Sequence, residues 1–295
     1  MSAVVRRRRP VRRWPARLVL LGPGTAWWLL FFLIPVGVLV VYSFYTRGPY
    51  GGVVPTFTLD NYARALDSLY LGVLWTSIWI AAIATAAALL IGYPAAVFIA
   101  RASPRARTVL LLLVILPFWT SFLIRTYAWM VLLNPTGLIN RVLLGVGVID
   151  EPLPLLYNDF AVVLGLVYAY LPLMILPIYA SLERLGAATG EAAADLYAGP
   201  WATLRRVTLP LTLPGIVAGC IFVFVPSLGN FIVPDLLGGG QTVMVGNLIQ
   251  QQFLTARDWP FGAVLAMSVV ALMFVVLGIQ AQVLRREQEV EHGRA

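Results

Sequence analysis

The sequence predicts an all-α integral membrane protein with six transmembrane helices. Of its 295 residues, 60% are hydrophobic and only 12% are charged, and the mean hydropathy is +0.85. Soluble domains carry about a quarter charged residues, so this composition excludes an ordinary soluble fold. Six apolar stretches are long enough, at roughly 20 residues or more, to cross the hydrocarbon core. They should be helical, because unpaired backbone groups in lipid are too costly.

The N-terminal tail, residues 1–17, holds seven arginines and is followed by an apolar run over 18–45. Three interpretations compete: a secretory signal, a nucleic-acid-binding arm, or a cytoplasmic anchor for a first span. A signal has an apolar segment of about 7–15 residues and a small-residue cleavage site. This run is longer and has no such site, so we favour an uncleaved first helix and expect no nucleic-acid partner. The arginines would then lie against anionic membrane lipid, each contributing about 1 kcal/mol.

Five further spans complete a transmembrane domain over 18–284. They are expected at 70–100, 108–133, 160–182, 207–234 and 261–284. Several contain proline, which removes a backbone hydrogen bond and tends to kink a helix. These prolines are Pro94, Pro117, Pro172, Pro177 and Pro226. The bundle should therefore be bent, although proline is also common in ordinary transmembrane helices. The stretch 235–260 is too polar and glycine-rich for a seventh span, which leaves a re-entrant or surface helix.

The arginines are distributed unequally between the two sides of the membrane. Six spans put both termini on one side, and 16 of the 21 basic residues fall on that side. Cytoplasmic loops are the ones that carry an excess of Lys and Arg. We therefore expect both termini, including the tail 285–295, to be cytoplasmic, together with the loops 101–107 and 191–216.

The sequence also excludes several kinds of chemistry. It contains no Lys, and a Walker-type P-loop requires a Gly-Lys step to bind nucleotide phosphates. Cys220 and His292 are the only residues of their types, so neither a disulfide within the chain nor a Cys/His metal cluster is possible. No metalloprotease motif and no pair of intramembrane aspartates is present. We expect a non-catalytic chain that binds no metal and no cofactor.

A self-sufficient secondary transporter is an alternative from another functional class. Such a protein needs a proton or ion relay of Asp, Glu or His inside its spans. The nearest acids here are Glu183, at the inner end of the fourth span, and Asp235, at the outer end of the fifth. No span interior clearly offers an acid, so this alternative is remote.

One polar interruption, residues 191–216, separates two long apolar stretches. Its first part, beginning at Glu191, reads as a short helix that Gly199 would end, and Pro200 suits the first turn of the next helix. A second short helix is expected from Trp201 to Val207. This pair of helices could be a docking surface for another protein, or a surface helix lying on lipid headgroups.

The same stretch resembles the EAA motif of ABC importer permeases. The family pattern is Glu-Ala-Ala, three residues, Gly, nine residues, Ile, any residue and Leu-Pro, and the spacing here agrees throughout. Val207 stands at the Ile position, and Tyr197 stands where the family has glycine; Gly199 could substitute for that glycine. The resemblance implies that a coupling loop, residues 185–213, contacts an ATP-binding subunit. The implied coupling residues are Glu191, Ala192, Ala193, Asp195, Tyr197, Gly199, Pro200, Trp201 and Leu204.

The likeness extends from about residue 18 to 284 and is to the spermidine/putrescine-type permease subunits. The stretches that carry it are FTLDNYARALD (57–67), PFWTSFLIRTYAW (117–129), GVID (147–150), VPDLLGG (233–239) and RDWPFG (257–262). The family implies a type I importer in the bacterial inner membrane. It contains two homologous permeases, a dimer of ATP-binding subunits that use ATP and Mg²⁺, and an extracytoplasmic solute receptor.

A polyamine cargo would need acidic or aromatic groups along its path, because it carries several positive charges. The candidate pathway residues are Phe118, Trp119, Tyr127, Asn230 and Asp235. The aromatic ones could instead serve helix packing or the interfacial belts. Arg125 would repel a cation if it lay in the path, or it could extend to the outer interface. Another solute, such as an opine, an amino-acid derivative or ferric ion, is the alternative cargo.

Overall fold

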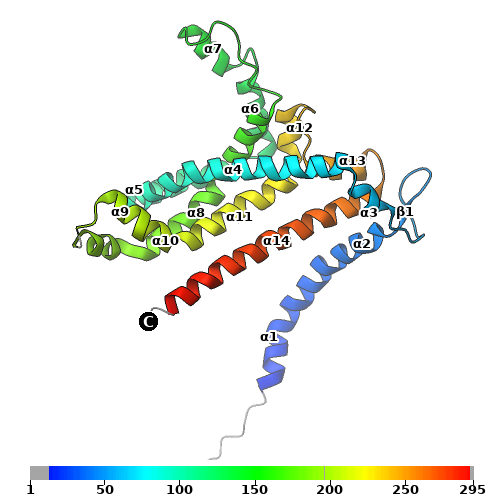
Figure 1. Ribbon diagram of the computed structural model, residues 1–295, viewed down its shortest axis with the longest axis horizontal. Coiled ribbons are helices and arrows are strands. Elements are labelled where there is room, and N and C mark those ends of the chain that lie inside the picture. The colour runs from blue at the N-terminus through cyan, green and yellow to red at the C-terminus, as the bar shows by residue number, and fades with distance from the viewer. Residues whose placement is uncertain (1–12, 196, 293–295) are drawn as a thin grey trace, which may run out of the picture.

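The computed structural model describes residues 13–195 and 197–292, and it consists almost entirely of helices (Figure 1). The first half contains α1 (Arg13–Trp28), a π-helical turn η1 (Leu29–Leu33), α2 (Ile34–Ser43), β1 (Thr46–Arg47), β2 (Val53–Val54), α3 (Asp60–Ala65), α4 (Ser68–Arg101), α5 (Pro104–Ile115), a 3₁₀ turn η2 (Leu116–Trp119), α6 (Phe122–Leu133) and α7 (Leu138–Gly145). The second half contains α8 (Asp159–Asp195), α9 (Pro200–Thr203), a π-helical turn η3 (Leu204–Thr208), α10 (Leu209–Leu211), α11 (Leu213–Gly229), α12 (Ile232–Gly238), α13 (Val245–Leu254) and α14 (Trp259–His292).

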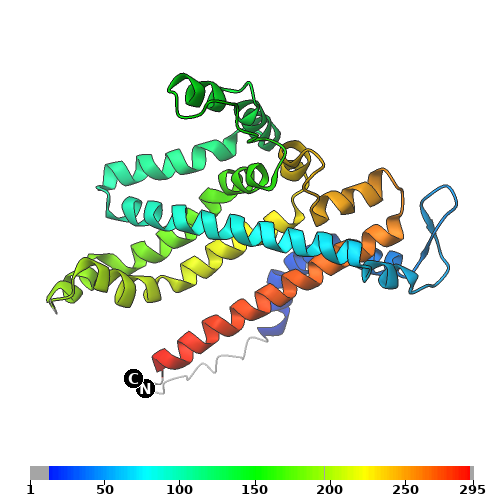
Figure 2. The same cartoon turned by 45° about the horizontal axis from the view of Figure 1, so that its top comes forward.

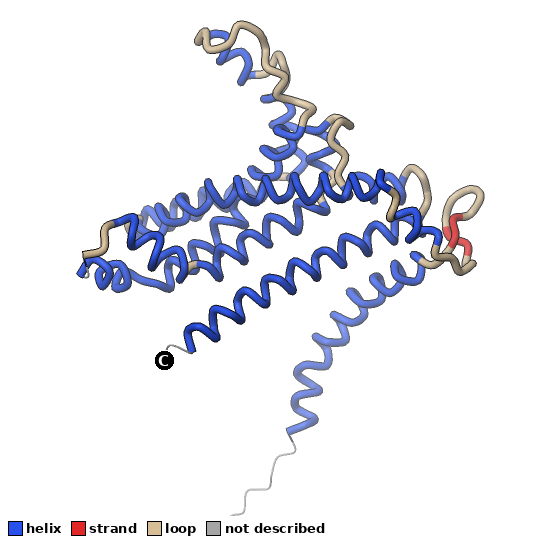
Figure 3. Tube along the Cα trace, viewed as in Figure 1, coloured by secondary structure: helices blue, strands red, loops and turns tan. Residues whose placement is uncertain are grey.

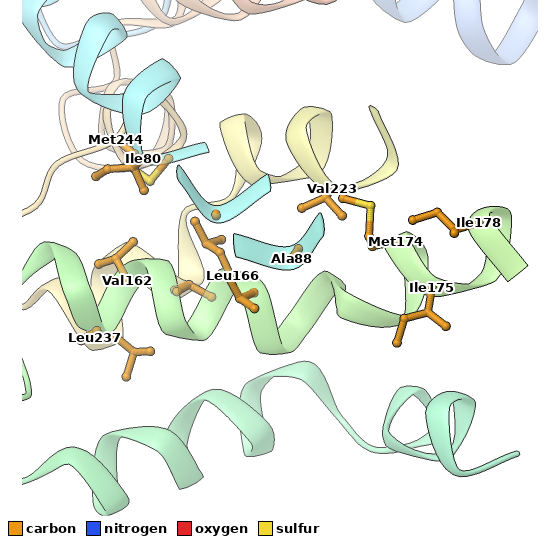
Figure 4. Close-up of a cluster of buried hydrophobic side chains, with 14 of the residues drawn as sticks. Ile80, Ala88, Val162, Leu166, Met174, Ile175, Ile178, Val223, Leu237 and Met244 are labelled. Carbon is orange, nitrogen blue, oxygen red and sulfur yellow. The ribbon is translucent and has the colours of Figure 1, made fainter. Parts of the chain in front are cut away.

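Helices α4, α8 and α11 form the centre of the bundle. Their buried apolar side chains interleave along α8, where Met174 lies beside Val223 of α11 (Figure 4). Two glycines make the close approach possible. A Cβ at Gly92 of α4 would lie 2.9 Å from Met174 Cγ, and one at Gly219 of α11 would lie 2.8 Å from its Sδ. Lipid tails are as apolar as the side chains, so helices in a membrane associate mainly through such tight packing of small residues.

Each predicted span falls on helical structure, but two of the six are bent pairs of helices. Within the part of the chain that the structure describes, four helices are long and apolar enough to cross a membrane alone: Leu21–Ser43, Ser68–Arg101, Asp159–Gly186 and Trp259–Gln280. The other two spans are Pro104–Trp119 with Phe122–Gly145, bent by 93°, and Pro200–Leu211 with Leu213–Gly229, bent by 67°. Counting each pair as one span gives the six that the sequence predicts.

The stretch predicted as a single third span, 108–133, is not one continuous helix. Helix α5 passes into the 3₁₀ turn that contains Pro117, the backbone is extended at Thr120, and α6 begins at Phe122. Pro117 cannot donate a backbone hydrogen bond, which weakens the helix at this point. Proline alone does not decide the outcome, because Pro94 lies inside α4 without ending it.

The fifth predicted span, 207–234, is also divided. Its straight part is α11, which ends at Gly229, and Asn230 separates it from the short helix α12. The polar stretch 235–260 contains α13, whose first turn is buried against the bundle next to α14. The helix expected in this stretch is therefore present, and it packs against protein.

The loops with most of the arginines gather at one end of the bundle. The turn between α4 and α5, the α9–α10 segment and the C-terminal part of α14 all lie at the left in Figures 1 and 2. The β1–β2 hairpin, α3 and α13 lie at the opposite end, and Figure 3 shows the hairpin in red. The turn between α4 and α5 and the α9–α10 segment thus lie at the opposite end of the bundle from the hairpin.

An ion pair joins two distant segments at the hairpin end. Arg64 Nη1 of α3 lies 2.9 Å from Asp258 Oδ2, and the Asp258 side chain is only 3% exposed. The Arg64 guanidinium also lies 3.8 Å from the centroid of the Phe261 ring. Burial alone would lower the pKa of Arg64, but hydrogen bonding and charge from Asp258 and Tyr70 outweigh it, so the net pKa is raised. This arginine therefore stays charged and fixes α3 to the start of α14.

Replacing Arg64 by glutamine is expected to destabilise the protein by about 1–2 kcal/mol, because the nearly buried carboxylate of Asp258 loses its cationic partner. The effect is smaller than for a fully buried pair, since Arg64 itself is half exposed. The measurement is the thermal unfolding midpoint of the purified membrane protein. Arg141→Gln, at an exposed arginine of α7, is the control. Equal midpoints for the two variants would show that the ion pair contributes nothing.

Candidate functional site

The segment with the EAA-like pattern, residues 187–211, consists of short helices that leave the bundle at its arginine-rich end, and we call this segment the excursion. Gly186, with φ 64° and ψ 179°, breaks α8, and a separate helical segment continues to Asp195. Helix α9 then begins with Gly199 as its N-cap and Pro200 in its first turn, where the sequence predicts that proline. The prediction that Gly199 ends the preceding helix is wrong, because that helix ends at Asp195. With η3 it covers the second short helix expected at 201–207. The side chains of Glu191 and Ala192 lie outside the described residues.

Tyr197 takes the conformation that a glycine would provide. Its φ is 57°, in the left-handed region, while Gly199 has φ −64°. Gly199 is therefore not the substitute that the sequence suggested. The N–H of Ala198 donates to the carbonyl of Ala193 at 3.0 Å, the bond that closes a helix end through a left-handed residue. A non-glycine residue in this conformation costs about 1–2 kcal/mol, so the helix end closes here at a cost in strain.

The effect of a substitution at Tyr197 should depend on how readily the new residue adopts the left-handed backbone conformation, and not on the size of its side chain. Tyr197→Gly is expected to stabilise the protein by about 1 kcal/mol, because the same turn forms without strain. Tyr197→Ile should destabilise it, since a β-branched residue is poorly accommodated at positive φ. The thermal unfolding midpoint of the purified protein measures both effects, with Tyr197→Asn as an intermediate case. A glycine variant less stable than the isoleucine variant would show that the phenol, not the turn, matters.

The excursion exposes large side chains to its surroundings. Tyr197 is 98% exposed and Trp201 is 72% exposed, and Asp195, Gly199 and Pro200 are exposed as well. Ala193 is buried and Leu204 is half-buried, so they hold the segment together from within. An exposed tryptophan next to an exposed tyrosine at the end of the bundle is the composition of an interface anchor.

A second candidate site is the polar break between α11 and α12. Asn230 is buried, its Nδ2 donates to the Tyr170 hydroxyl at 2.7 Å, and its Oδ1 accepts from the Val233 backbone at 2.9 Å. Asn247 of α13 donates from Nδ2 to Asp235 Oδ1 at 3.0 Å. Polar groups at membrane depth need such partners, and they often mark a solute path. Asn247 is not among the residues predicted from the sequence, although its place at the start of a helix in a glutamine-rich stretch was a usable signal.

Arg125 lies next to this break and contacts Phe118, which the sequence predicts as a pathway residue. The guanidinium is 5.4 Å from the ring centroid of Phe118 and 5.7 Å from that of Phe122. Its Nε and Nη1 are buried and have no hydrogen-bond partner among the described residues. The Phe122 ring in turn lies 6.5 Å from the Tyr170 ring, which continues to Asn230. Phe118 therefore belongs to the cluster.

The remaining two predicted pathway residues, Trp119 and Tyr127, are mostly exposed on the surface of this chain. Among the described residues, their side chains make no hydrogen bond or ring contact with the polar break. Their position is compatible with a contact to lipid or to another protein.

Comparison with known proteins agrees with this architecture. The profile of the family described as "Binding-protein-dependent transport system inner membrane component" matches residues 88–288. The spermidine/putrescine transport system permease protein PotB of Escherichia coli is 44% identical over 268 residues, covering 90% of this chain and 98% of that protein. PotB of Haemophilus influenzae is 42% identical over 268 residues, covering 90% and 94%. The resemblance predicted from the sequence is thus confirmed.

Two solved structures share the fold at low identity. A bacterial ABC transporter that imports the acidic polysaccharide alginate has 18% identity and a TM-score of 0.69, covering 93% of this chain and 96% of that chain. The methionine transporter MetNI in an inward-facing conformation has 16% identity and a TM-score of 0.56, covering 75% and 99%. These similarities establish the fold of a type I importer permease with several membrane spans. The chain is a multi-pass inner-membrane protein and belongs to the family of binding-protein-dependent transport system inner membrane components.

Proposed function

We propose that this chain is one permease subunit of an ATP-driven importer that takes up polyamines of the spermidine and putrescine class. The observation that carries the proposal is the 44% identity to the Escherichia coli permease, which extends over 98% of that relative. A match of this extent includes the polar break and the EAA-like segment together. It therefore supports a shared cargo class as well as a shared fold.

The partners follow from this assignment. A dimer of ATP-binding subunits supplies ATP hydrolysis with Mg²⁺, a second homologous permease completes the pathway, and an extracytoplasmic receptor delivers the solute. Both termini lie in the cytoplasm, an orientation supported by the 16 arginines on that side. The chain itself is non-catalytic and binds no cofactor.

The coupling role rests on the excursion at residues 187–211. Trp201 and Tyr197 are exposed and available to enter a groove on the ATP-binding subunit. A 67° bend joins this segment to α11, so a displacement of the segment is transmitted directly to a core helix. Glu191→Ala tests the motif's first residue: if ATP-driven uptake and assembly are unchanged, Glu191 has no part in coupling.

The pathway role rests on the polar break. A cation passing the polar break could contact an aromatic ring, that of Tyr170. It could also contact oxygen atoms, those of the Asn230 amide and the exposed Asp235 carboxylate. These contacts are few, which suits a path that passes the solute onward and leaves selection to the receptor. The observation that favours a different cargo is Arg125, since its guanidinium next to Phe118 would repel a polyamine and attract a carboxylate.

Uptake of labelled spermidine and putrescine by vesicles containing the complete importer tests the proposal. Saturable uptake that requires ATP and is blocked by excess spermidine is expected. Carboxylate-bearing amino-acid derivatives should not compete. If vesicles that couple ATP hydrolysis to receptor addition take up no polyamine, the importer assignment stands and the polyamine cargo is wrong.

A further inference from the structure

A cavity of about 560 Å³ lies where the excursion joins the bundle. Four segments line it: the end of α4, the start of α5, the end of the straight part of α8, and the α9–η3 segment. The lining includes two arginines, Arg101 and Arg107, and one acid, Glu183. Gly186, where α8 breaks, and Thr203, in α9, also line the cavity. A molecule bound in this cavity would contact both the bundle and the excursion.

The hydrogen bonds of Arg107 leave part of its guanidinium unused. Its Nη2 donates to the Ala100 carbonyl at 2.9 Å, and its Nη1 lies 3.5 Å from Glu183 Oε1, a long contact. Its Nε is buried with no hydrogen-bond partner among the described residues. Glu183 already accepts a 2.7 Å hydrogen bond from Tyr179. The cavity lining thus offers an anionic oxygen two guanidinium groups, and the one lining carboxylate, Glu183, is already engaged by Tyr179 and Arg107.

A second cavity of about 600 Å³ adjoins the first, and Val97 and Arg101 line both. Its lining is mainly apolar, with Pro94, Phe98 and Trp201 among its residues. A site with two arginines is thus continuous with an apolar groove on the side of α4. Both lie at the arginine-rich end of the bundle, where α4 ends and the α9–η3 segment begins. Basic pockets between transmembrane helices on the cytoplasmic side are suited to phospholipid headgroups.

We propose that the two cavities form a binding site for one anionic phospholipid of the cytoplasmic leaflet. The headgroup phosphate binds Arg107 and Arg101, and an acyl chain occupies the groove along Phe98. The bound lipid then bridges α4 and α5 to the α9–η3 segment and holds the excursion at a fixed angle. Coupling between ATP hydrolysis and the spans is therefore dependent on anionic lipid.

The test uses the assembled importer in nanodiscs of zwitterionic lipid, titrated with phosphatidylglycerol. Native mass spectrometry measures retained phosphatidylglycerol, and receptor-stimulated ATP hydrolysis is the second readout. Arg107→Gln is expected to weaken retention about tenfold, the effect of losing one charge-assisted hydrogen bond. Arg101→Gln is the second variant, because its side chain is exposed and its loss should not affect folding. Arg105→Gln, in the same turn but outside the cavity lining, is the matched control.

Reduced retention of phosphatidylglycerol in both the Arg107→Gln and the Arg101→Gln variant, with the Arg105→Gln control like wild type, supports the lipid site. Equal retention in all four proteins overturns it. Inorganic phosphate is added to zwitterionic discs in a further arm: if phosphate alone restores stimulation, the site takes a free anion and the lipid assignment is wrong. Phe98→Ala should weaken retention of the lipid and leave any effect of phosphate unchanged. Retention is measured independently of cargo, so the site can fail while the proposed function stands.

Discussion

Replacing Trp201 by alanine is expected to abolish ATP-driven uptake while the protein still folds. The side chain is 72% exposed at the end of the bundle, so its removal costs this chain little packing. In the importer we expect it to be an anchor in the groove of the ATP-binding subunit. Truncating an aromatic anchor typically costs about 2–4 kcal/mol, or a factor of about 30 to 1000 in affinity.

The measurement is co-purification of the ATP-binding subunit with the permease, followed by receptor-stimulated hydrolysis and uptake in vesicles. The matched control is Trp27→Ala, at a tryptophan that is 67% exposed. It belongs to α1, which lies apart from α9 and α10 in Figures 1 and 2. Normal assembly of the Trp201 variant together with normal uptake would contradict the docking role. Equal loss in both variants would indicate a general effect of removing exposed tryptophans.

The second large effect is expected at Gly215, near the start of α11. A Cβ at this position would lie 2.6 Å from the carbonyl oxygen of Pro177 and would also collide with the Ser181 side chain. Backbone atoms cannot move aside as a flexible side chain can, so Gly215→Val must push α11 away from α8. Overpacking of this kind costs about 1–3 kcal/mol and sometimes more, and the contact between these two helices is central to the bundle.

The variant should be recovered in low yield and unfold at a lower temperature, as monitored by size-exclusion chromatography after heating. Gly278→Val in α14 is the control, because a Cβ there meets no described atom within 4 Å. A normal midpoint for Gly215→Val would mean that α8 and α11 are not packed as closely as described. Because Gly215 follows the excursion directly, any surviving protein should also couple poorly.

Much of this structure could be predicted from the sequence, because lipid imposes simple rules. The length of each apolar run and the bias of the arginines gave six spans and a common end for the loops 101–107 and 191–216. The suitability of Pro200 for a first helical turn placed the start of α9 correctly. These features could be predicted because they depend on local composition, which can be read directly from the sequence.

The features that could not be predicted depend on distant contacts. Proline at 117 and at 94 look alike in sequence, yet only the first lies at a break in the helix. The left-handed backbone of Tyr197 is a local exception: the bond that closes this helix end joins Ala198 to Ala193, and only the glycine position of the motif indicated it. Arg107 and Glu183 are 76 residues apart, so their contact appears only once α5 and α8 are packed. The partner of Asn247 could not be identified for the same reason.

The most direct test of the central claim is to ask what Trp201 touches in the assembled importer. A photo-reactive p-benzoylphenylalanine at this position, with a second variant carrying it at Trp27, distinguishes a docked segment from a helix lying on headgroups. Illumination is expected to cross-link position 201 to the ATP-binding subunit, in an amount that changes when ATP is added, and to leave position 27 linked to lipid. Adducts of position 201 with lipid alone would contradict the coupling role and leave the segment as a surface helix.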